Sequence, residues 1–91
     1  MPKVLEFGSY VLFFWAAEDG EPVHVHVAVR RPTEGATKIW LTRDGGCVLA
    51  HNAGHIPPKD LRTILELVAA NHGLICRAWR EHFGVEPRFY C

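Results

Sequence analysis

Two histidines, His24 and His26, are the residues of this chain best placed to do chemistry. They alternate with valines in the run from Pro22 to Val29, and that alternation is typical of a β-strand. Strand side chains alternate between faces, so both imidazoles share one face and the four valines the other. Such a pair can bind a metal ion, act as acid and base, or pack on a partly exposed sheet face or in a subunit contact without binding anything.

A metal site at this pair needs a third ligand. The acidic candidates are Glu18, Asp19 and Asp44, which fall in predicted turns. His51 and His55 follow the fourth predicted strand, but their spacing is not a zinc motif. They reach the pair only if that strand lies beside the one that carries His24, and the sequence leaves the strand order open. We expect no obligatory cofactor, with zinc at His24 and His26 as the alternative.

Other catalytic arrangements find little support. Ser9 is the only serine, and it lacks the glycine setting of a nucleophile elbow. The cysteines Cys47, Cys76 and Cys91 are odd in number and show no CxxC spacing, which argues against a disulfide scaffold and a structural zinc site. They fit a reducing cytoplasm.

The composition bounds the class of protein. Ninety-one residues predict a single domain over 1–91, and ten Lys and Arg balance ten Asp and Glu. This neutral balance gives no electrostatic case for binding nucleic acid. The N-terminus lacks a signal-peptide pattern, and the longest apolar run, from Tyr10 to Ala17, is too short to span a membrane. We therefore expect a cytoplasmic protein.

The remaining elements follow from periodicity and turn residues. Apolar runs predict four strands over residues 4–17, 23–31, 36–42 and 47–50, two of the turns containing Asp-Gly. Pro57 and Pro58 open a first helix, which Gly73 is expected to stop, and a second helix around Trp79 ends at Gly84. The expected fold is α+β: an antiparallel meander of about four strands with two C-terminal helices packed on one face.

The first predicted strand is apolar on both faces at its centre. Helices in so small a chain can cover only one face, so Val11, Phe13 and Trp15 are the predicted interface with a second subunit.

The order of these features resembles a small bacterial family known only as a domain of unknown function. Its members carry an apolar strand, an acidic Pro-containing turn, a Pro-His-x-His strand, a Gly-containing hairpin and a proline-opened helix with a downstream Trp. The counterparts here are Phe7 to Trp15, Glu18 to Pro22, Pro22 to Val27, Asp44 to Gly46, and Pro57 to Trp79. The chain departs from the family in having Val25, not an aromatic residue, between the histidines.

The resemblance implies toxin–antitoxin-like gene pairs, so that protein–protein contact is central, and it supplies no catalytic residues that can be assigned to this chain. We therefore expect an interaction module that forms a homodimer or binds a cognate partner. The alternative is a small hydrolase or ribonuclease that uses His24 and His26 as acid–base or metal-binding groups.

Homodimerisation is the first testable expectation. If Val11, Phe13 and Trp15 form an apolar interface, the purified protein should sediment as a dimer at micromolar concentration, because burying that face stabilises association. Sedimentation velocity is the measurement, and a clean monomer would contradict the expectation.

Overall fold

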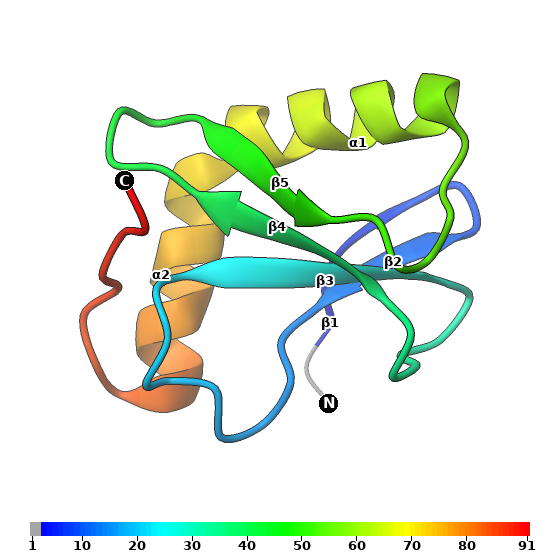
Figure 1. The fold of residues 1–91 in the computed structure, drawn as a ribbon. Coiled ribbons are helices and arrows are strands. Elements are labelled where there is room, and N and C mark those ends of the chain that lie inside the picture. The colour runs from blue at the N-terminus through cyan, green and yellow to red at the C-terminus, as the bar shows by residue number, and fades with distance from the viewer. Residues whose placement is uncertain (1–2) are drawn as a thin grey trace.

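A computed structural model describes residues 3–91, which form one five-stranded antiparallel sheet followed by two helices (Figure 1). The strands are β1 (Lys3–Phe7), β2 (Tyr10–Phe13), β3 (His24–Val29), β4 (Thr37–Leu41) and β5 (Cys47–His51). The helices are α1 (Pro58–Ala70) and α2 (His72–Phe83). The predicted α+β class, the antiparallel meander and the two C-terminal helices are confirmed, with five strands in place of four.

The single first strand predicted over residues 4–17 is wrong. It is two strands, joined by a tight turn at Gly8 and Ser9 that sets Phe7 opposite Tyr10. Gly8 adopts a φ of 58°, a left-handed conformation that glycine reaches without the steric penalty of a side chain. Two residues between two apolar stretches were too brief a break for the hydrophobic pattern to reveal.

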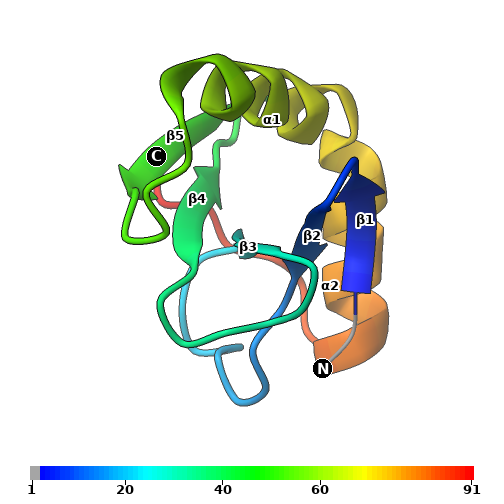
Figure 2. The same cartoon turned by 90° about the vertical axis from the view of Figure 1, so that its right-hand side faces the viewer.

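Each strand pairs with its neighbour in sequence, so β3 lies at the centre of the sheet and β1 and β5 form its edges. On one side of β3, Phe13 of β2 lies opposite His26. On the other side, Trp40 of β4 lies opposite His24. The sheet curls, and its two edges rise toward the side that carries the helices (Figure 2).

Both helices begin and end for local reasons. Pro58 occupies the first turn of α1, where its missing N–H is no loss, and Asp60 places a negative charge at the same end. The predicted stop at Gly73 is wrong, because α1 ends at Ala70 and α2 starts at His72. Asn71 makes the break, and its side-chain amide donates to the Leu67 carbonyl. The predicted end of α2 at Gly84 is confirmed by a left-handed φ of 72°.

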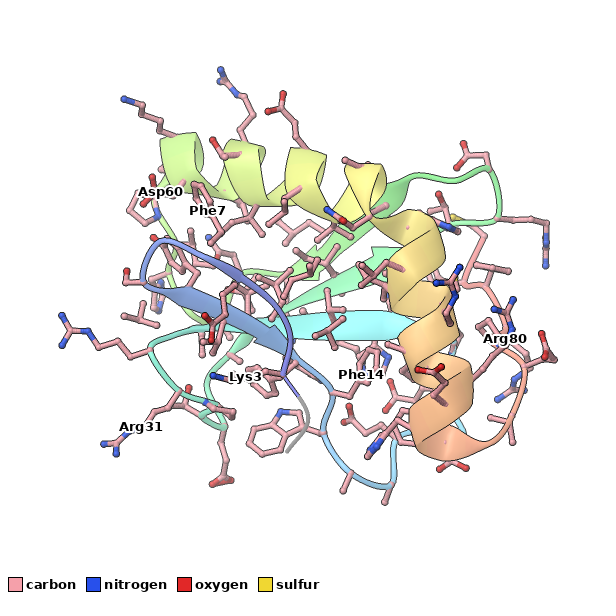
Figure 3. The ribbon with its side chains drawn as sticks, turned by 180° about the vertical axis from the view of Figure 1, so that it is seen from behind. Lys3, Phe7, Phe14, Arg31, Asp60 and Arg80 are labelled. Carbon is pink, nitrogen blue, oxygen red and sulfur yellow. The ribbon has the colours of Figure 1, made fainter. Side chains whose placement is uncertain are left out.

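The main core lies between the helices and one face of the sheet. Val25 and Val27 of β3 are fully buried there. Phe14, which follows β2, points between the sheet and α2 (Figure 3), and its ring meets the Trp79 ring edge-on at a centroid distance of 5.2 Å. Burying these large apolar side chains is the dominant favourable contribution to the stability of the fold.

Part of the opposite face of the sheet is covered by the chain itself. Val11, Phe13, Ala28 and Ala36 form a second buried cluster, with Trp15 packed against it. Phe13 is fully buried and Val11 is 5% exposed. The argument that a chain of this size cannot cover this face is therefore wrong for these two residues, whereas the dimer itself stays a prediction.

The C-terminal segment after α2 returns to the sheet. The Val23 amide donates to the Arg88 carbonyl at 2.7 Å, and the Arg43 amide donates to the Cys91 carbonyl at 2.8 Å. The Tyr90 ring stacks on the Trp40 ring at a centroid distance of 5.0 Å. The tail thus docks beside the residues that lead into β3.

Two valines of β3 give a matched test of the core. Val25→Ala should lower the free energy of unfolding by about 1–3 kcal/mol, because it removes two buried methyl groups and leaves a cavity. Val29→Ala removes the same atoms at a site 52% exposed, and should change stability by less than about 0.5 kcal/mol. Urea denaturation of both variants is the measurement. Equal losses would contradict the placement of β3.

Candidate functional site

Glu18, His24 and His26 converge on the face of β3 opposite its core valines, and the His24 ring also meets the Trp79 ring of α2 at a centroid distance of 5.5 Å. The two histidines lie two residues apart on β3, as the alternation predicted. Glu18 belongs to the connection between β2 and β3, which folds back over the strand. Its Oε1 atom lies 2.7 Å from Nε2 of His24 and 2.9 Å from Nε2 of His26. One carboxylate oxygen is therefore shared by two imidazoles.

The imidazoles are buried, which corrects the expectation of a partly exposed sheet face. His24 is 1% exposed and His26 is 7% exposed. The His26 ring lies against Phe13 and Trp15. The His24 ring packs edge-on to Trp40. Solvent reaches the cluster through the Glu18 side chain, which is 27% exposed.

Both ring nitrogens of His24 face oxygen atoms. Nδ1 lies 2.8 Å from the Pro22 carbonyl oxygen, which can only accept, so Nδ1 carries a hydrogen and donates it. Nε2 faces Glu18 Oε1, which also accepts when the carboxyl is ionised. One proton between Nε2 and Glu18 Oε1 therefore satisfies both atoms.

The surroundings of the cluster shift the pKa values of Glu18 and His26. Burial of the Glu18 carboxyl opposes its ionisation, but the hydrogen bonds and charges of His24 and His26 outweigh it, so the pKa of Glu18 lies below its usual value. Burial lowers the pKa of His26 below its usual value, against the opposing hydrogen bond and charge of Glu18. The cluster therefore favours an ionised Glu18 beside a neutral His26.

Lys38, whose charge acts on His26, is paired with a carboxylate of its own. Its ammonium group lies 2.6 Å from Glu21 Oε1 and 4.2 Å from the centroid of the Trp40 ring. The charge of Lys38 disfavours a second positive charge on His26, but the pairing with Glu21 reduces its field at the cluster.

The structure does not bring His51 and His55 to this cluster. His51 is exposed at the end of β5, and β4 separates that strand from β3. His55 is exposed in the segment before α1. Because β5 is not next to β3, neither His51 nor His55 reaches the histidine pair.

Of the acidic candidates, Glu18 is the one that completes the cluster. Asp44 instead accepts hydrogen bonds from Thr42 and Gly46 in its own turn. The sequence placed Glu18 in the turn before the histidine strand, but nothing in that pattern separated it from Asp19.

The three cysteines lie in different parts of the fold. Cys47 is part-buried on β5, and its thiol donates to the Leu65 carbonyl at 3.3 Å. Cys76 is buried on α2 and Cys91 is exposed. Burial raises the pKa of both Cys47 and Cys76, which disfavours the reactive thiolate.

An apolar groove of about 610 Å³ runs between α1 and the edge strand β5. Leu61, Leu65 and Ala69 of α1 form its apolar wall, and Arg62 and Glu66 place charges of both signs on the same helix. Cys47 lines the groove from β5. The groove therefore lies at one edge of the sheet, because β5 is the last strand in the strand order.

The fold and the site define a small α+β domain with a buried glutamate–histidine cluster and an apolar edge groove. The family described as "Domain of unknown function (DUF4160)" matches residues 9–80, and the chain belongs to that family. The match confirms the resemblance to an unknown-function family. No curated protein and no solved structure matches the chain. Within residues 3–91, no helix is both long and apolar enough to cross a bilayer.

Burial changes what is expected of the histidine pair. His24→Ala should lower the free energy of unfolding by about 1–3 kcal/mol, because it leaves a cavity and strips the Pro22 carbonyl of its hydrogen bond. His51→Ala is the matched control at an exposed site and should stay within about 0.5 kcal/mol. Urea denaturation reports both values, and a His24 variant as stable as the control would contradict the buried cluster.

Proposed function

We propose that this chain is a protein-interaction module whose docking surface is the groove between α1 and β5. The groove is the observation that carries the proposal, because it sets apolar side chains beside an open sheet edge. The other apolar face of the sheet, around Val11 and Phe13, is already buried by the chain's own connections. Apolar surface that remains accessible on a small protein commonly marks a binding site.

The occupant that fits this surface is an extended segment of a partner protein. β5 pairs with β4 on one side, and its other edge ends the sheet. An added strand would use the free backbone of that edge for hydrogen bonds, and its side chains would fill pockets along it. Leu61 and Leu65 supply the apolar pocket, while Arg62 and Glu66 can orient a segment with charges of both signs.

The partner follows from the family resemblance. A toxin–antitoxin-like gene pair implies that the partner is the product of the adjacent gene, and that this chain is one component of the pair. A homodimer joined through two β5 edges is the other outcome. It would place the subunit contact at β5 in place of the predicted contact at Val11, Phe13 and Trp15.

A second candidate is a small histidine-dependent hydrolase or ribonuclease. The convergence of Glu18, His24 and His26 favours it, because acid–base catalysis needs such groups within hydrogen-bond reach of one another. Against it, both imidazoles are buried and both Nε2 atoms already face Glu18. An organic substrate would have to displace the carboxylate to reach them. Release of products from single-stranded RNA by the wild type, abolished in His26→Gln, would favour this candidate over the interaction module.

Adjacent alanines of α1 give a matched test of the groove. Ala69 lines the groove, whereas Ala70 is exposed and outside its lining. Ala69→Arg should fill the groove and weaken binding of the adjacent gene's product by tenfold or more, as expected for a bulky side chain in an apolar interface. Ala70→Arg adds the same charge one residue away and should leave the affinity within about twofold.

Isothermal titration calorimetry of the co-expressed pair measures both affinities, and circular dichroism establishes that each variant is folded. Equal effects of the two substitutions on affinity would show that the groove does not take part in binding. A wild type that binds neither that product nor itself would overturn the proposed function.

A further inference from the structure

We propose that Glu18, His24 and His26 form a binding site for one divalent transition-metal ion, with zinc as its representative. This site is separate from the docking groove and does not depend on it. Three features of the cluster support it: the spacing of its ligand atoms, the direction of the His24 lone pair, and the type of atoms presented.

The spacing is close to that of a metal centre. The three groups each offer one ligand atom, and these atoms all lie within 4.8 Å of one another. Ligand atoms about 2.0–2.2 Å from a zinc ion lie roughly 3–3.5 Å apart. The Glu18 oxygen stands at 2.7 and 2.9 Å from the two nitrogens, so a withdrawal of less than about 1 Å by the carboxylate makes room for an ion.

The direction of the His24 ring requires either a proton or a metal ion between its Nε2 atom and Glu18. The Nδ1–H group donates to the Pro22 carbonyl, so a neutral His24 turns the lone pair of Nε2 toward Glu18 Oε1. Two acceptor atoms 2.7 Å apart repel each other unless a proton or a metal ion lies between them. The geometry therefore holds a place for a positive charge, and a metal ion can take it.

The same hydrogen bond is the one that metal-binding histidines make. A ligating imidazole commonly donates its second N–H to a backbone carbonyl, which fixes the tautomer and the ring direction. Pro22 provides that carbonyl two residues before His24. Packing against Phe13 holds the neighbouring His26 ring as well, so both nitrogen ligands are positioned before an ion arrives.

The ligand set selects the class of ion. Two imidazole nitrogens and one carboxylate oxygen suit zinc, nickel, copper or iron, whereas magnesium and calcium prefer sites made of oxygen atoms. Three protein ligands leave the fourth position to water. Glu18 forms the exposed side of the cluster, and water can reach the ion there. A bound ion would fasten the β2–β3 connection to the central strand of the sheet.

Zinc titration of chelator-treated protein, followed by calorimetry, tests the site in the presence of a reducing agent. The expected result is one zinc ion per chain and a higher melting temperature, because an ion that binds the folded state alone stabilises it by mass action. Magnesium should give neither effect. Glu18→Gln and His26→Gln should each weaken zinc binding by at least about tenfold.

Matched variants separate this site from incidental metal binding. His51→Ala, His55→Ala and Cys91→Ser remove exposed groups that could hold zinc, and should leave the affinity unchanged. Cys76→Ser tests another possible zinc-binding pair, since the Cys76 sulfur lies 3.9 Å from Nδ1 of His72. Glu18→Gln changes a part-exposed side chain, so it tests the site even if the buried His26 variant does not fold.

Cobalt substitution supplies an independent reading of the ligands. Binding at this cluster should give the visible absorption of four-coordinate cobalt without a thiolate charge-transfer band. The proposal would be overturned if the wild type showed neither zinc heat nor a thermal shift. Unchanged binding in Glu18→Gln, or loss of binding in Cys76→Ser, would overturn it equally.

Discussion

The burial of β3 on both faces is the constraint on which the rest of the structure depends. On the side that faces the core, β3 buries valines, whose side chains have no polar group that needs a hydrogen-bond partner. On the other side, two imidazoles are removed from water, and buried polar groups must find hydrogen-bond partners inside the protein. A single oxygen atom of Glu18 is the hydrogen-bond partner of both imidazoles. That requirement directs the connection between β2 and β3 back across the sheet, and Trp15 in the same connection helps to close the second core.

Much of the fold could be predicted because its signals are local. The valine alternation of β3, the prolines that open α1 and the left-handed Gly84 each depend on a few neighbouring residues. The errors arose where local signals were ambiguous. A two-residue Gly-Ser turn split the first strand, and Asn71 ended the first helix before the predicted stop at Gly73. The coverage of Val11 and Phe13 was misjudged, because the count of covering elements included helices and left out connecting segments.

The candidate site could be predicted only in part. Alternation alone placed His24 and His26 on one face, and that placement is correct. The third member lies in an irregular connection, where periodicity gives no direction for a side chain, so Glu18 could not be told from Asp19. Burial of the imidazoles was also beyond reach, because it depends on aromatic side chains from other strands and from α2.

The meander also has a consequence for the order in which the chain assembles. Every strand pairs with its neighbour in sequence, so each pairing closes a short loop, and topologies dominated by local contacts fold fast. The C-terminal tail is the exception, since the hydrogen bond from Val23 to Arg88 joins distant parts of the chain. Its docking is therefore expected to be the last step of folding, completed on a sheet and helices that already exist, and the first to be undone when the protein opens.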